Sequence, residues 1–113
     1  MPYRQRDLLL VPIPFSDLAS AKIRPVLVIS NDRYNQDGPD ILVAAITSNT
    51  APRSFIVPID SPQLEEGVMK RASVVRADKI FSIDQAIALR RFGRATFGVL
   101  EDVRRALANL IAS

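Results

Sequence analysis

Short runs of apolar, often β-branched residues recur along the chain, and clusters of turn-forming residues separate them. Runs of this length with turns between them are typical of strands in an antiparallel barrel, whereas alternating strand–helix units need longer helical segments between the strands. The pattern therefore predicts a mainly antiparallel β-barrel. The runs expected to form strands are residues 7–13, 25–30, 40–47, 54–59, 73–81 and 88–94.

The composition of individual runs predicts where they lie in the sheet. Residues 40–47 are almost continuously apolar, so this strand is expected in the interior of the sheet. Pro58 cannot donate a ladder hydrogen bond, which favours an edge position for residues 54–59. Residues 31–40 contain Asp37-Gly38-Pro39 and are expected to form a loop, as are Glu65 and Glu66 beside Gly67.

The C-terminal segment has a different periodicity. Its apolar residues recur at steps of three and four, which predicts an amphipathic helix whose apolar stripe packs on the core. The members of the stripe are Phe97, Leu100, Val103, Leu107, Leu110 and Ile111. Thr96 is the expected N-cap, and Glu101 should face Arg104 and Arg105. A chain of 113 residues fits one domain, taken here as residues 1–113.

The chain contains no cysteine and no histidine. Their absence excludes disulfides, cysteine nucleophiles, the Ser-His-Asp arrangement and the usual zinc or iron sites, so we expect no metal and no cofactor. The apolar run that begins at Leu8 is interrupted by Pro12 and Pro14 and is too short to span a membrane. We therefore expect a cytoplasmic protein.

Positive charge is concentrated between residues 70 and 94. Seven cationic side chains in this stretch face two carboxylates, those of Asp78 and Asp84. The cations are Lys70, Arg71, Arg76, Lys79, Arg90, Arg91 and Arg94. Such a surface suits a polyanion, although charge alone does not distinguish this from a solvated basic face.

Arg24 and Thr47 are the candidate site residues. Arg24 precedes Pro25 and a buried-type run, which favours an extended arginine held at the rim of a barrel. Thr47 ends the next apolar run, beside Ser48 and Asn49. Spacing alone also fits an Arg24 that ion-pairs with Asp7 or Asp17 and a Thr47 that bonds turn backbone.

Two sequence blocks resemble the MazF/PemK toxin family. They are Arg24-Pro25-Val26-Leu27-Val28 and Ile46-Thr47-Ser48, in the family's order and spacing. The opening residues 6–18 and the later block around residues 73–84 are also similar to the family. The chain departs from the family pattern at Arg6, at Ile23, and around Lys79 and Phe81.

The resemblance implies an SH3-like barrel that forms a homodimer, cleaves single-stranded RNA without a metal ion, and is neutralised by a MazE/PemI-like antitoxin. It places the family's essential arginine on Arg24 and its essential threonine on Thr47. The other candidate RNA contacts are Phe15, Lys22, Ser30, Asn31, Ser48, Asn49 and Lys79. The alternatives are a non-catalytic gyrase-directed toxin of the CcdB type and a passive nucleic-acid-binding barrel, because fold alone does not separate these functions.

Overall fold

The computed structural model describes residues 2–13 and 22–113, which form seven strands, two α-helices and two short 3₁₀ turns. The strands are β1 (Asp7–Ile13), β2 (Lys22–Val28), β3 (Asp40–Thr47), β4 (Ile56–Ile59), β5 (Leu64–Glu66), β6 (Ser73–Asp84) and β7 (Arg90–Ala95). The helices are α1 (Asp32–Asp37) and α2 (Phe97–Ile111), and the 3₁₀ turns are η1 (Ser61–Gln63) and η2 (Gln85–Ile87).

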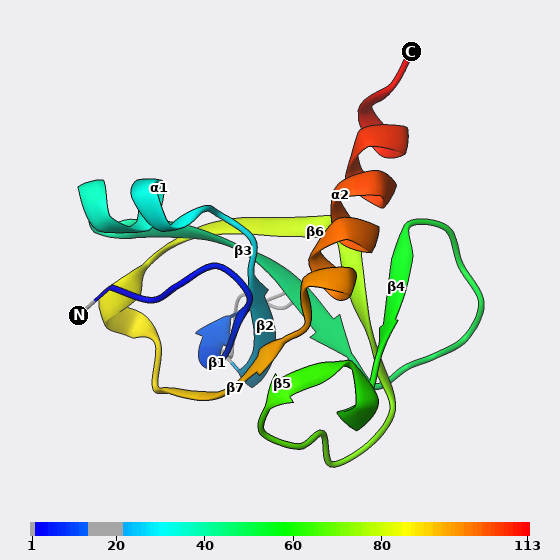
Figure 1. Cartoon of the computed structure of the whole chain (residues 1–113), viewed down its shortest axis with the longest axis horizontal. Helices are drawn as coiled ribbons and strands as arrows, with labels where there is room; N and C mark the ends of the chain where they lie inside the picture. Colours follow the sequence, from blue (N-terminus) through cyan, green and yellow to red (C-terminus); the bar gives the residue numbers. More distant parts are fainter. Residues whose placement is uncertain (1, 14–21) are drawn as a thin grey trace.

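All strands belong to one antiparallel sheet in the order β4-β6-β3-β2-β1-β7-β5, and the sheet curls strongly around its apolar interior (Figure 1). The mainly antiparallel β architecture with a C-terminal helix is confirmed. As predicted, β3 is an interior strand and β4, which contains Pro58, lies at an edge. The other edge is β5, so the curled sheet has two open ends.

Most predicted strands lie within a few residues of their observed bounds, and two, residues 7–13 and 40–47, match them in full. The fourth strand begins at Ile56 instead of residue 54, because Phe55 has a φ of +62°, which an extended strand does not accommodate. The second strand begins at Lys22, three residues before its predicted start, and ends at Val28 instead of residue 30.

Two predicted loops are regular elements. The segment 31–40 contains α1, which Asn31 caps by accepting a hydrogen bond from the amide of Tyr34 at 2.8 Å. Glu65 and Glu66 belong to β5, where Glu66 lies opposite Arg94 of β7. In both cases tertiary partners stabilise a segment whose turn-type composition suggests a loop.

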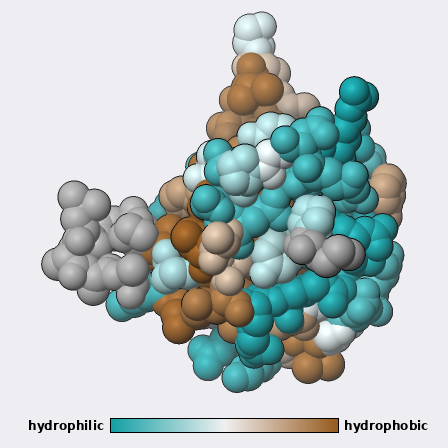
Figure 2. Space-filling view, turned by 90° about the vertical axis from the view of Figure 1, so that its left-hand side faces the viewer, coloured by the Kyte–Doolittle hydropathy of each residue, from teal (hydrophilic) through white to brown (hydrophobic). Residues whose placement is uncertain are grey.

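Helix α2 begins where predicted, with the Thr96 hydroxyl accepting from the Val99 amide. Its first half packs on the sheet, and its C-terminal end stands clear of the body (Figure 1). That projecting end is largely hydrophobic at its surface (Figure 2), where Ile111 is 76% exposed. Arg104 pairs with Glu101 as expected, whereas Arg105 pairs with Asp102.

The sheet separates two apolar clusters, because successive side chains of a strand point to opposite faces. Leu8 belongs to the cluster between the sheet and α2, and its neighbour Leu9 belongs to the cluster on the other face. On β2, Leu27 and Val28 divide in the same way. Burial of both faces explains why these runs are apolar at nearly every position.

Candidate functional site

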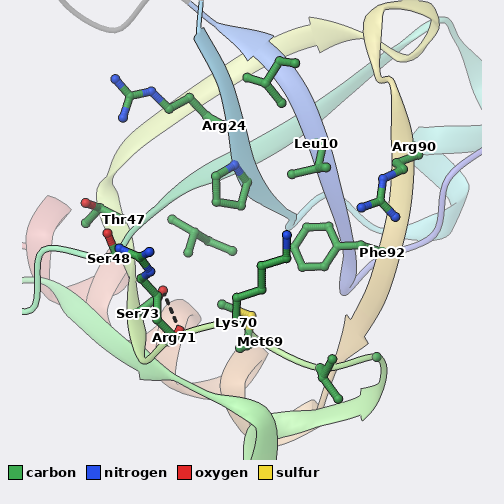
Figure 3. A pocket seen from close by; sticks show the side chains of 15 residues that line it. Leu10, Arg24, Thr47, Ser48, Met69, Lys70, Arg71, Ser73, Arg90 and Phe92 are labelled. Atoms are coloured by element: carbon green, nitrogen blue, oxygen red, sulfur yellow. Dashed lines mark hydrogen bonds between the residues drawn. The ribbon is translucent and has the colours of Figure 1, made fainter.

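A pocket of about 550 Å³ opens where the ends of β2 and β3 meet the segment that follows β5 (Figure 3). Side chains from β1 and β7 complete its walls. The lining residues are Leu10, Ile23, Arg24, Pro25, Ile46, Thr47, Ser48, Gly67, Val68, Met69, Lys70, Arg71, Ser73, Arg90 and Phe92. The pocket therefore brings together residues that are far apart in the sequence.

Arg24 and Thr47 both lie at this pocket. The hydrogen-bonded pairing of β2 with β3 ends at Val26 and Ala45. Arg24 lies two residues before Val26 in the chain, and Thr47 lies two residues after Ala45. Pro25 has no amide proton, so the ladder cannot continue through it with full hydrogen bonding. Beyond that point the strands no longer pair, and Figure 3 shows Arg24 and Thr47 at one rim of the pocket, away from its apolar floor.

The Thr47 hydroxyl accepts a hydrogen bond from the backbone amide of Asn49 at 3.2 Å. This bond matches the turn-stabilising role that spacing alone allows, and it also fixes the orientation of the oxygen. A hydroxyl that accepts one bond keeps its own proton for donation to a ligand. Ser48 lines the pocket, whereas Asn49 lies in the following turn and accepts from the amide of Ala51.

The described residues that line the pocket include four cationic side chains and no carboxylate. The cations are Arg24, Lys70, Arg71 and Arg90. Within residues 2–13 and 22–113, no salt bridge involves Lys70, Arg71 or Arg90. Among the described residues, the positive charges of Lys70, Arg71 and Arg90 are therefore not balanced by an ion pair, which suits an anionic ligand.

Other cations of the basic stretch have structural partners. Asp7 is nearly fully buried and its carboxylate accepts from Arg91 Nε at 3.0 Å and from Arg94 at 3.1 Å. Asp7 is thus paired with these two arginines and not with Arg24; Asp17 lies outside the described residues. Arg76 makes a bidentate pair with Asp78, and its hydrogen bonds lower the pKa of that carboxyl.

Glu66 connects this arginine cluster to the segment that lines the pocket. It accepts from Arg91 at 2.7 Å and lies 3.7 Å from Arg94. The hydrogen bond from Arg91 holds the pKa of the Glu66 carboxyl below its usual value, and the same contact raises the pKa of Arg91. The ion pairs fix the end of β5 against β7, immediately before Gly67.

Gly67 and Gly93 allow β5 and β7 to approach closely. Gly67 has a φ of +87°, and a Cβ there would lie 2.4 Å from the carbonyl oxygen of Phe92. A Cβ on Gly93 would meet the carbonyl oxygen of Glu66 at the same distance. These two glycines therefore set the position of the pocket wall that carries Met69, Lys70 and Phe92.

The remaining predicted contact residues are dispersed. Lys22 is exposed at the start of β2, and Lys79 is half-buried in β6; neither lines the pocket. Phe15 lies outside the described residues. Ser30 is 8% exposed, and its hydroxyl donates to Asn35 Oδ1 and accepts from the Leu42 amide. Asn31 caps α1, so the geometry gives Ser30 and Asn31 structural roles.

Several pocket residues were not predicted individually from the sequence. Lys70, Arg71 and Arg90 were noted only as part of a basic stretch, and Phe92 was not identified. The sequence holds no signal for Phe92, because the direction of its side chain depends on a register shift in the β1–β7 ladder. Within the described ranges, no cluster of three or more Asp or Glu residues is arranged to hold a metal ion.

Comparison with known proteins identifies the family of this chain. Residues 4–111 match the model of the PemK-like, MazF-like toxins of type II toxin–antitoxin systems. The chain is 32% identical over 103 residues to endoribonuclease MazF6 of Mycobacterium tuberculosis, which covers 87% of this chain and 86% of that protein. Endoribonuclease MazF2 of Mycobacterium bovis has the same identity and coverage.

In the described part of the chain, no helix is long and apolar enough to cross a membrane.

Solved structures show the same fold. MazF from Deinococcus radiodurans superposes with a TM-score of 0.79 at 23% identity, covering 98% of this chain and 97% of that one. A MazE–MazF complex from the same organism gives a TM-score of 0.79 at 25% identity, again covering 98% and 97%. With a family model that spans almost the whole sequence, the chain belongs to the PemK-like, MazF-like toxins of type II toxin–antitoxin systems.

Proposed function

We propose that this toxin is an endoribonuclease that cleaves single-stranded RNA at short sequences, without a metal ion, and that Arg24 and Thr47 carry the chemistry. The observation that supports this most directly is the shared pocket, where Arg24 and Thr47 border a cavity whose described lining residues include four cations and no carboxylate. Relatives that are 32% identical over most of the chain are named endoribonucleases.

RNA supplies its own nucleophile in such a reaction. The 2′-hydroxyl loses its proton and attacks the adjacent phosphorus, the bond to the 5′-oxygen breaks, and that oxygen takes up one proton. The products carry a 2′,3′-cyclic phosphate and a 5′-hydroxyl. Negative charge builds up on the phosphorane oxygens during this step. The planar guanidinium of Arg24 can donate two parallel hydrogen bonds to these oxygens, which stabilises the charge. A guanidinium keeps its proton at neutral pH and is a poor proton carrier, so we assign Arg24 electrostatic stabilisation.

Thr47 is proposed to donate a hydrogen bond from its hydroxyl to a phosphoryl or leaving oxygen. The hydrogen bond from the Asn49 amide orients its oxygen before RNA binds. Preorganised donors of this kind lower the barrier because they need no rearrangement during the reaction. Ser48 extends the same rim and is proposed as a neighbouring phosphate or sugar contact.

Further RNA contacts are proposed outside the pocket. Lys22 and Asn49 are exposed on the strand and turn next to Arg24 and Thr47, and Lys79 lies on β6. Phe15 is proposed as a base-stacking residue from the sequence alone. Ser30 and Asn31 are left out of the proposed interface, because their side chains make internal hydrogen bonds.

We propose a cytoplasmic homodimer that a MazE/PemI-like antitoxin neutralises. Structures named as MazE–MazF complexes and as an endoribonuclease with its cognate antitoxin share the fold, the latter with a TM-score of 0.73. An acidic antitoxin segment would complement the cationic pocket. Mass measurement by light scattering should give twice the chain mass, and a monomer across the working concentration range would contradict the dimer.

The function is tested by mapping cut sites and end chemistry on long single-stranded RNA in the presence of EDTA. Discrete cuts with cyclic phosphate and 5′-hydroxyl ends are expected. Salt-sensitive binding without new RNA ends would instead support a passive binding barrel. Inhibition of gyrase in the absence of RNA cleavage would support the CcdB-type alternative.

Substitutions separate the roles of the two site residues. Arg24→Ala should lower the cleavage rate by roughly 100- to 1000-fold, as removal of one preorganised donor typically does. Arg24→Lys should be nearly as impaired, because lysine keeps the charge but loses the fork. Thr47→Ser should retain more activity than Thr47→Ala. A fully active lysine variant would refute the bidentate role.

A further inference from the structure

The pocket beside Arg24 and Thr47 has an interior and a rim of different chemistry. Its interior is formed by aliphatic side chains and one aromatic ring, and its cations stand around this apolar surface. The interior residues are Leu10, Pro25, Ile46, Met69 and Phe92. A ligand that matches both parts needs a flat apolar group joined directly to anionic groups, which describes a nucleotide within an unpaired strand.

From this arrangement we infer that the pocket holds one unpaired base of the RNA, next to the phosphate that is cut, with the ring of Phe92 as its stacking surface. The inference rests on the proposed ribonuclease function and adds a specificity-determining residue to it. The base would be adjacent to the cut because Arg24 and Thr47 form one rim of the same cavity.

Phe92 is placed for this role by a bulge in β7. In the ladder with β1, Gly93 pairs with Leu8 and Arg91 pairs with Leu9, so Phe92 has no partner on β1. A bulge of this kind re-aims a side chain. Arg91 and Arg94 bind Asp7, whereas the Phe92 ring points into the pocket (Figure 3).

The wall that carries Phe92 is held firmly. A Cβ at residue 67 would lie 2.4 Å from the carbonyl oxygen of Phe92, so only glycine fits against this wall. The Glu66–Arg91 ion pair, at 2.7 Å, also joins β5 to β7 at the residue next to Phe92. A ring on a wall fixed in this way can stack on a base with little loss of freedom on binding.

Cations around the ring are placed to contact the phosphates that flank such a base. Figure 3 shows the Lys70 side chain pointing into the middle of the pocket near Phe92, with Arg90 on the side opposite to Arg24. Neither Lys70 nor Arg90 forms a salt bridge among the described residues. Phosphate contacts give affinity for any sequence, whereas contacts with the base give specificity. The two groups of residues should therefore affect cleavage differently.

The test compares Phe92→Leu with wild type on short single-stranded RNAs. These RNAs carry one mapped cut site, with each of the four bases placed in turn at the positions on either side of the cut. In Phe92→Leu, cleavage of the preferred RNA should fall at least about fivefold, since base–aromatic stacking contributes this much or more. The wild-type preference at one of these positions should also weaken, because bases differ in stacking strength. Phe92→Tyr, which keeps an aromatic face, should restore the preference.

Phe97→Leu is the matched control, because this exposed aromatic residue lies on α2 outside the pocket. It should leave the base preference and the cleavage rate unchanged. Lys70→Gln should slow cleavage of all the RNAs by a similar factor. A Phe92→Leu protein that folds, cuts and keeps the wild-type preference overturns the inference and favours a protein side chain as the occupant. If wild type cuts no RNA, the proposed function itself has failed, and the two failures are distinguishable.

Discussion

At the scale of single residues, the carboxylates near each arginine decide what that arginine does. Arg91 and Arg94 share the buried Asp7 and therefore stabilise the fold. Arg90, the neighbour of Arg91, has no described carboxylate partner and lines the pocket. Adjacent residues with the same side chain thus face a buried carboxylate and the pocket respectively, because alternate positions of a strand point to opposite sides.

Substitution of Glu66 tests whether its ion pair with Arg91 stabilises the fold. Its pKa is held below the ordinary value of 4.5 by the hydrogen bond from Arg91. The stabilising effect of this carboxylate is therefore complete above 4.5 and is lost as the pH falls through the lowered pKa. Thermal unfolding of wild type and Glu66→Gln should show a gap in melting temperature at neutral pH that narrows in acid. A gap that stays constant over this range would contradict the role of the pair.

At the scale of elements, predictions succeeded where burial determines the residue type. Strands β1 and β3 are buried on both faces, so their apolar runs mark their bounds in full. Helix α1 and strand β5 were predicted as loops, because their residues are polar and each has a distant partner, Gln85 for α1 and Arg94 for β5. Local composition carries no signal for contacts of that kind.

The candidate site likewise contains residues that the sequence predicts and one that it does not. Arg24 and Thr47 were predicted as site residues because Arg24 begins one apolar run and Thr47 ends another, in blocks that resemble the toxin family. Both lie at the pocket, and their role in catalysis stays a prediction. Phe92 could not be predicted, because its direction depends on a bulge against β1, and the sequence does not reveal where a ladder shifts by one residue. The pocket is formed mostly by contacts between residues distant along the chain.

Two glycine substitutions should have different effects on stability, because Gly67 lies against the backbone of β7 whereas Gly98 of α2 has no close neighbour. Gly67→Ala places a Cβ 2.4 Å from a backbone oxygen in a left-handed conformation, so it should lower the free energy of unfolding by about 1–3 kcal/mol. Gly98→Ala lies in α2, where the nearest atom is 3.8 Å away, and should leave stability unchanged or raise it by up to about 1 kcal/mol. Denaturant unfolding measures both. Equal destabilisation by the two variants would argue against close strand approach as the cause.

At the scale of the whole molecule, the modest net charge of +3 conceals an uneven distribution. Arg104 and Arg105 on α2 are paired with carboxylates of the same helix. At the pocket, by contrast, four cations and no carboxylate are found among the described lining residues. The electrostatic attraction for RNA should therefore come from one region of the surface, and net charge alone does not describe it.

Salt dependence measures this asymmetry. Binding of single-stranded RNA to the protein, followed by fluorescence anisotropy in the slowly cutting Arg24→Ala background, should weaken linearly on a log–log plot against salt concentration. Each phosphate contact adds about 0.7 to the slope, because contact with a cation releases counterions from the strand. Lys70→Gln and Arg71→Gln should each lower the slope by about that amount. Arg104→Gln removes the same charge from a position outside the pocket and should leave the slope unchanged. If all three variants reduce the slope equally, the attraction is a property of total charge and the pocket is not where RNA phosphates bind.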